Sequence, residues 1–175
     1  MEPGASVLEF PPPRLSIRRM KLRDWLERWG LSSLKINAGV LEMEWAPKDP
    51  DRQAAWELYV ELLTRIATQD LAPDHGDEAT ALKSIYDLFA LTRQTLKAHH
   101  GCDEFAKVAV VVLNQAVRPF TAKWHQLSLA GAFAEPARCT EFRAELATLQ
   151  ETLRRYTKAL ADLAGVEDLT SLQNH

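Results

Sequence analysis

The most informative pattern in this chain is the stretch Ala106-Lys-Val-Ala-Val-Val-Val-Leu-Asn-Gln-Ala-Val-Arg-Pro-Phe-Thr-Ala-Lys-Trp-His125. Its first half is almost wholly apolar, and its second half becomes polar, aromatic and basic. A helix advances about 100° per residue, so Asn114, Arg118, Thr121 and His125 fall on one narrow stripe. A stripe at this spacing is normally apolar and faces a core. Because this one is polar, it must either be satisfied by partners or line a cavity.

Pro119 lies inside this stripe. A proline in the interior of a helix removes one backbone hydrogen bond and clashes with the preceding turn. The sequence therefore predicts either a kinked helix or a second helix that begins with Pro119 near its first position. Both interpretations free backbone carbonyls around residue 115, which makes the surroundings of Arg118 the most specialised place in the chain.

Length and composition indicate one globular domain. The chain has 175 residues, of which 46% are hydrophobic and 26% charged, and this is enough for a sizeable core. Only seven glycines are present, which argues against an all-β fold rich in turns. The formal net charge of −3 gives no overall electrostatic attraction to nucleic acid, although a local basic patch is compatible with it.

Neither a membrane span nor a secretion signal is expected. No apolar run reaches the length that crosses a bilayer, and the first residues lack the basic and apolar regions of a signal peptide. Two cysteines, Cys102 and Cys139, are too few for a disulfide framework. We therefore expect a cytoplasmic protein with free thiols. The spacing of His99, His100 and Cys102 matches no zinc pattern, and no cofactor motif occurs, so no metal or other cofactor is expected.

The N-terminal part reads as an extended arm followed by a basic helix. Residues 1–13 end in three prolines and form the arm. Within 14–29, apolar side chains recur with helical spacing and include Trp25 and Trp29. The cations beside them are a candidate RNA-binding surface: Arg14, Arg18, Arg19, Lys21 and Arg23. The alternative is a helix docked by its tryptophans with a solvated basic face.

Residues 33–46 alternate apolar and polar side chains, which favours a small β-hairpin or an irregular extended segment. Together, residues 14–50 are expected to lie against a helical bundle that spans 51–165, with a tail over 166–175. Helical periodicity predicts four long helices, and short connections between them predict antiparallel neighbours. The expected fold is thus all-α, a four-helix up-down bundle. The predicted helices cover 52–69, 77–99, 103–130 and 137–164.

The first long helix carries a second polar stripe, which includes Glu57 and Glu61. Arg65 lies four residues after Glu61, where an exposed ion pair contributes a few tenths of a kcal/mol. Two interpretations remain open for the stripe. It is either a solvated face, or an inward network in which the carboxylates meet Arg93 or Arg118.

The segment Arg118-Pro-Phe-Thr-Ala-Lys-Trp-His125 resembles the Arg-x(4–6)-His signature of HEPN domains. HEPN domains are helical bundles, often dimeric, in bacterial toxins, antiphage systems and CRISPR effectors, and many are metal-independent ribonucleases. The resemblance implies that His125 transfers protons at the ribose hydroxyl or the leaving oxygen. Arg118 would stabilise the charge on phosphate, with Asn114 and Lys123 as helpers.

A non-catalytic bundle that binds a protein partner, or a second copy of itself, is the interpretation that the sequence favours. Tryptophan and arginine are common anchors of interfaces. In this hypothesis Arg118, Trp124 and His125, with Thr121 beside them, form a buried polar cluster or a recognition pocket. A ribonuclease requires Arg118 and His125 exposed together in a groove, whereas a structural cluster requires them buried. The resemblance suggests a subunit of a bacterial antiphage or toxin–antitoxin system as the biological setting.

Overall fold

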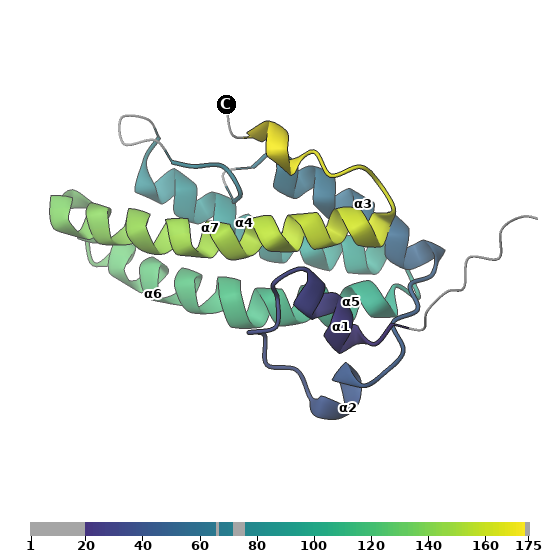
Figure 1. Ribbon diagram of the computed structural model, residues 1–175. Helices are drawn as coiled ribbons and strands as arrows, with labels where there is room; N and C mark the ends of the chain where they lie inside the picture. The colour runs from purple at the N-terminus through teal and green to yellow at the C-terminus, as the bar shows by residue number, and fades with distance from the viewer. Residues whose placement is uncertain (1–19, 66, 72–75, 174–175) are drawn as a thin grey trace, which may run out of the picture.

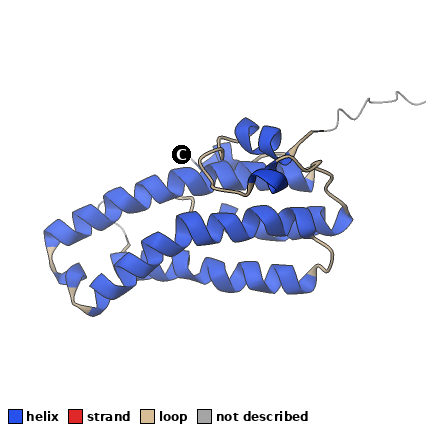
Figure 2. Cartoon of the chain, turned by 90° about the horizontal axis from the view of Figure 1, so that it is seen from below, coloured by secondary structure: helices blue, strands red, loops and turns tan. Residues whose placement is uncertain are grey.

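The protein is all-α. A computed structural model describes residues 20–65, 67–71 and 76–173. These residues are mostly helical, and they contain no β-strand (Figures 1 and 2). The predicted arm, residues 1–13, lies outside the described residues, as do Arg14, Arg18 and Arg19. The all-α class predicted from periodicity is confirmed.

The four long helical stretches predicted from the sequence all form. They are α3 (Asp49–Leu63), α4 (Glu78–Ala98), the stretch that contains α5 (Asp103–Val112) and α6 (Arg118–Leu129), and α7 (Pro136–Ala164). Asp77 begins α4, because its side chain accepts a hydrogen bond from the Thr80 backbone N–H. Gly165 ends α7 with a φ of 72°, a left-handed conformation that glycine adopts without strain.

The chain between α5 and α6 continues as a π-helical turn, Leu113–Val117, rather than breaking. Pro119 lies in the first turn of α6, where a missing backbone N–H is tolerated. The wider turn absorbs the hydrogen-bonding mismatch that a proline creates, and such turns are frequent at functional sites. Pro119 thus lies near the first position of α6, as the second alternative predicts, while one helical path runs from Asp103 to Leu129.

The hairpin predicted within 33–46 does not form. Its expected turn is instead the short helix α2 (Ala38–Leu41), begun by the Asn37 side chain, which accepts from the Gly39 N–H. The following residues pair with the chain before α1 (Leu22–Arg28), through an isolated antiparallel bridge between Lys21 and Glu44. The N-cap at Asn37 and the helical turn that it begins therefore determine the local structure, despite the alternating pattern of side chains.

One hydrophobic core joins the N-terminal segment to the long helices. Its largest fully buried side chains are aromatic: Trp25, Tyr59, Phe105, Trp124 and Phe142. The Tyr59 hydroxyl also accepts a hydrogen bond from the Leu169 N–H at 2.7 Å, which ties the segment before η3 (Thr170–Gln173) to α3. In the part of the chain that the structure describes, no helix is both long and apolar enough to cross a bilayer.

Candidate functional site between helices α4 and α6

The polar stripe of α6 forms one wall of a surface pocket of about 200 Å³. α4, which packs beside α6, forms the other wall. We call this pocket the α4–α6 groove. Its lining residues are Tyr86, Phe89 and Arg93 from α4, and Arg118, Thr121, Ala122 and His125 from α6. The helical spacing therefore identified one face correctly, but that face opens to solvent rather than to the core.

Arg118 is exposed and held in place by two contacts. Its Nε donates a hydrogen bond to Asn114 Oδ1 at 3.0 Å, one turn earlier in the helix. Its guanidinium carbon lies 5.1 Å from the centre of the Phe89 ring, in a cation–π arrangement. Asn114 thus acts as a neighbour that orients Arg118. The remaining guanidinium nitrogens have donors available for a ligand.

Arg93 and His125 are exposed in the same groove. Among the described residues, no carboxylate forms an ion pair with Arg93, Arg118 or His125. Two arginines on facing helices without a compensating acid raise the local positive potential. The α4–α6 groove is therefore suited to an anionic group.

Thr121 contributes to the wall but not to a polar contact with a ligand. It is buried, and its hydroxyl donates to the backbone carbonyls of Val117 and Arg118, both at 3.1 Å. These bonds satisfy the hydroxyl within the helix. We therefore assign Thr121 a structural part in the site.

A second hollow of about 340 Å³ extends the groove along the same two helices. It shares Tyr86 and His125 with the first, and Lys83 and Phe133 also line it. Tyr86 stands between the two hollows with 58% of its surface exposed. An exposed aromatic ring flanked by cations can stack on a planar group or anchor a protein interface.

The predicted buried cluster of Arg118, Trp124 and His125 does not form, because only Trp124 is buried. The Trp124 indole N–H donates to the Glu145 carboxylate of α7 at 2.9 Å. Lys123 also faces α7, where it pairs with Glu145 and Glu141. These hydrogen bonds raise the pKa of Lys123. Both residues lie outside the α4–α6 groove, so Lys123 is not placed to help Arg118.

Of the two interpretations of the polar stripe on the first long helix, the inward network with Arg93 or Arg118 is absent from the described residues. Glu61 accepts from Arg65 Nε at 2.9 Å, as an i,i+4 pair on α3. Glu57 instead holds the end of α4, where it accepts from the Thr95 hydroxyl at 3.1 Å and contacts His99 Nε2 at 2.7 Å. Glu61 and Arg65 therefore pair within α3, and Glu57 links α3 to α4, away from the groove.

The basic N-terminal surface is partly neutralised where the structure describes it. Lys21 Nζ lies 2.5 Å from a Glu42 carboxylate oxygen, and Arg23 pairs with the other oxygen. The hydrogen bond from Lys21, with the charge of Arg23, lowers the pKa of Glu42. Less positive charge is therefore free at this surface than the sequence suggests.

No group of three or more His, Cys, Asp or Glu side chains is placed to hold a metal ion within the described ranges. Both cysteines there are free thiols. Burial is the main cause that raises the pKa of each thiol, Cys102 and Cys139. A raised pKa leaves little thiolate at neutral pH, so neither cysteine has the character of an activated nucleophile.

Two residues of the groove were missed by the sequence interpretation, namely Tyr86 and Phe89. Neither side chain was singled out as part of a site. A signal was present, since Tyr86, Phe89 and Arg93 lie at offsets of three and four and so share one face of α4. Without knowing which helix packs against α4, the sequence could not show that this face borders Arg118.

Comparison of the chain with protein-family models, with curated proteins and with solved structures found no match.

Proposed function

We propose that the protein is a non-catalytic interaction module that binds an acidic protein partner through the α4–α6 groove. In this proposal α3, α4, α5–α6 and α7 act as a four-helix up-down bundle that holds the two walls of the groove at a fixed separation. The observation that carries the proposal is the joint exposure of Arg93 and Arg118, with no described carboxylate paired to either.

The aromatic side chains of the groove support binding to a protein. Arg and Tyr are enriched among the residues that dominate interface energies. Tyr86 is exposed between two hollows, and Phe89 supports the Arg118 guanidinium from below. An acidic side chain of a partner would pair with Arg93 or Arg118 while its apolar neighbours cover Tyr86.

The geometry of Arg118 favours binding over catalysis within one chain. His125 lies seven residues after Arg118, a rise of about 10 Å along the helix. The hydrogen bond to Asn114 draws the guanidinium toward the preceding turn, in the direction opposite to His125. A catalytic pair must converge on one phosphate, at hydrogen-bonding distance from both groups.

The second candidate is a metal-independent ribonuclease that uses Arg118 and His125. It is supported by the exposure of both side chains in one groove, because such an enzyme requires both of them to reach the RNA. Convergence on one phosphate would then require Arg118 to swing toward His125, or a second copy of the chain to supply one of them. Under either candidate, the resemblance of the Arg118–His125 segment to HEPN domains supports the proposal of a role in a bacterial antiphage or toxin–antitoxin system.

One pair of experiments separates the candidates. The first incubates the purified protein with mixed-sequence single-stranded RNA in EDTA, beside the His125→Ala variant. Since His125 is exposed, the variant should fold normally. Cleavage by the wild type that His125→Ala loses would establish the ribonuclease and refute the non-catalytic proposal.

The second experiment places a photo-crosslinking benzoylphenylalanine at Tyr86, or at the exposed Lys158 of α7 as a control, in the native host. A discrete protein adduct from position 86 only is the expected result, and it should weaken when Arg118 is changed to Gln. Adducts of equal yield at both positions would count against the α4–α6 groove as the binding face.

A further inference from the structure

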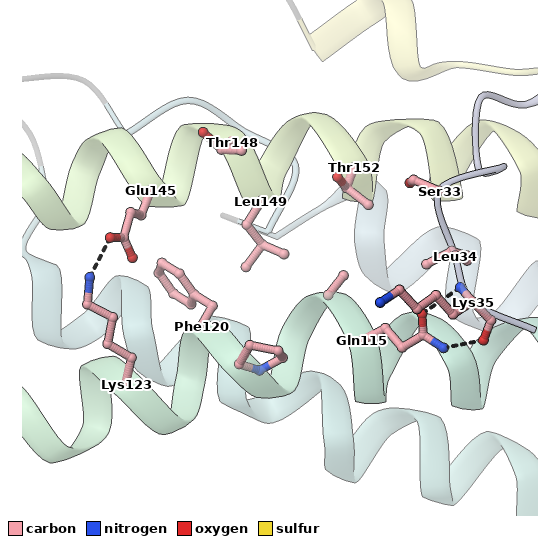
Figure 3. Close-up of a pocket in the computed structure, with 12 residues that line it drawn as sticks. Ser33, Leu34, Lys35, Gln115, Phe120, Lys123, Glu145, Thr148, Leu149 and Thr152 are labelled. Atoms are coloured by element: carbon pink, nitrogen blue, oxygen red, sulfur yellow. Dashed lines mark hydrogen bonds and ion pairs between the residues drawn. The ribbon is translucent and has the colours of Figure 1, made fainter.

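A third and larger hollow lies on the opposite side of α6, between α6 and α7, with a volume of about 940 Å³ (Figure 3). It shares no lining residue with the α4–α6 groove. Ligand pockets in proteins commonly measure about 300–1,000 Å³. We call it the α6–α7 groove.

Apolar side chains form the floor of this groove. Ala116 and Pro119, at the junction of the π-helical turn with α6, line it. Phe120 from α6 and Leu149 from α7 lie beneath with only 8% and 7% of their surfaces exposed. The middle of the groove therefore offers an apolar surface, which favours the hydrocarbon part of a ligand.

One end of the groove is closed by the loop that precedes α2. The Lys35 backbone N–H donates to Gln115 Oε1 at 2.7 Å, and Gln115 Nε2 donates to the Lys35 carbonyl at 2.5 Å. Gln115 belongs to the π-helical turn, so the turn and the loop are fastened to each other. This clamp uses only the backbone of Lys35, which leaves its side chain free to extend toward the groove (Figure 3).

The two ends of the groove differ in charge. At the far end Lys123 pairs with Glu145 and Glu141, and Arg138 also pairs with Glu141, so the charges there compensate one another. At the near end no carboxylate of the described residues pairs with Lys35. Thr148 and Thr152 line the groove from α7 (Figure 3). The unbalanced positive charge is thus at one end of an apolar trough.

We propose that the α6–α7 groove binds a small amphipathic anion, with its acidic group at Lys35 and its apolar body on Phe120 and Leu149. From residue 115 to residue 123 the helix rises about 12 Å, which suits a molecule with one or two aromatic rings or a medium-length acyl chain. The compensated pair of Lys123 and Glu145 marks the far limit, since it offers no net charge to a second acidic group.

The test uses two fluorescent probes that differ in charge. Anilinonaphthalene sulfonate carries a sulfonate beside its rings, and N-phenylnaphthylamine has similar rings without the charge. Both are titrated into the purified full chain, and octanoate is then added to displace them. The expected result is saturable binding of one probe per chain, tighter for the sulfonate, with displacement by octanoate.

Two matched variant pairs locate the site. Thr148→Trp should fill the groove and weaken binding by at least about tenfold, whereas Thr140→Trp should not. Both threonines are exposed on α7, and each hydroxyl bonds the carbonyl four residues earlier, but only Thr148 lines the groove. Lys35→Gln, which keeps the backbone clamp, should abolish the preference for the sulfonate, and Lys158→Gln should leave it unchanged.

Three outcomes would overturn the proposal. The first is the absence of saturable binding by the folded wild type. The second is equal binding by the Thr148→Trp and Thr140→Trp variants, which would place the probe elsewhere. The third is an unchanged preference for the sulfonate in Lys35→Gln, which would remove Lys35 as the acidic group's partner. Because the two grooves share no residue, none of these results bears on the α4–α6 groove.

Discussion

The indole N–H of Trp25 donates a hydrogen bond to the Asp162 carboxylate at 2.7 Å, and this bond joins α1 to the end of α7. The Trp29 indole N–H approaches the same oxygen at 3.3 Å. Trp25 is buried, with 1% of its surface exposed, so its N–H has no access to water. One carboxylate therefore satisfies the polar atoms of both tryptophans that the sequence placed on a docking face.

Replacing Asp162 by Ala should lower the free energy of unfolding by about 2–3 kcal/mol, because the buried indole N–H of Trp25 loses a charged acceptor. Asp162→Asn keeps an acceptor and should lose about 1 kcal/mol. Urea unfolding monitored by tryptophan fluorescence measures both. Asp87→Asn, which removes an exposed pair with Lys83, is the control and should cost less than about 0.5 kcal/mol. Equal losses for Asp162→Ala and Asp87→Asn would contradict the assignment.

Tyr156→Phe should leave the stability unchanged or raise it by about 1 kcal/mol. The Tyr156 hydroxyl is buried and has no hydrogen-bond partner among the described residues, and burial also raises its pKa. The matched variant is Tyr59→Phe, which removes a hydroxyl that accepts from the Leu169 N–H. It should lose about 1–2 kcal/mol. Thermal unfolding compares the two, and a larger loss for Tyr156→Phe would reveal a partner for its hydroxyl.

Gln115→Ala should release the loop around Lys35, because both bonds of the backbone clamp disappear. We expect faster hydrogen exchange at the Lys35 amide and a loss of about 0.5–1 kcal/mol in stability, since the clamp is exposed to water. Gln115→Glu still accepts from the Lys35 N–H but cannot donate to its carbonyl. Exchange at the Lys35 amide in this variant should therefore be faster than in the wild type and slower than in Gln115→Ala. Identical exchange in all three proteins would show that the clamp does not hold the loop.

Arg93→Gln and Arg118→Gln should each change the stability by less than about 0.5 kcal/mol, because both side chains are exposed. Each should nevertheless weaken the binding of an acidic partner about tenfold at low salt, and less at high salt, where charges are screened. Titration calorimetry at two salt concentrations measures this with the partner identified by crosslinking. A weakening that does not depend on salt would argue against a charge contact.

Asp77→Asn should destabilise the protein at neutral pH but not in strong acid. Hydrogen bonds from the Thr80 N–H and hydroxyl hold the pKa of Asp77 below its usual value. A carboxyl with a lowered folded-state pKa stabilises the fold above its unfolded value, and this contribution is lost as the pH falls through the folded value. The difference in melting temperature between wild type and variant should therefore shrink with acidification. A difference that persists below the folded-state pKa would point to another cause.

Much of the fold could be predicted from the sequence because the long helices carry strong, regular apolar stripes. The N-cap at Asp77 and the end of α7 at Gly165 can also be predicted from the sequence, since each depends on local backbone chemistry. The structure of residues 33–46 could not be predicted, because an alternation of apolar and polar side chains over a few residues is a weak signal. There the Asn37 cap and the contacts with Lys21 and Gln115 determined the structure.

Only the α6 wall of the candidate site could be predicted from the sequence. Spacing placed Arg118, Thr121 and His125 on one face, but the partner of that face depends on how α4 and α6 pack. The partners of Glu57 and Trp124 could not be predicted for the same reason, since His99 and Glu145 lie far from them in sequence. Periodicity reports which residues share a face, whereas only the tertiary arrangement reports what the face meets.

The π-helical turn separates the orientation of α6 from the number of residues in the segment before it. It holds one more residue than an α-helical turn would use over the same rise. Five residues of a π-helix and four residues of an α-helix rotate the chain by nearly the same angle, so the turn absorbs its extra residue without rotating α6. Deleting one residue within Leu113–Val117 should therefore give an ordinary α-helical turn that keeps Trp124 in the core and Arg118 beside Phe89. The length of this segment can thus differ by one residue while each groove keeps its own face of α6.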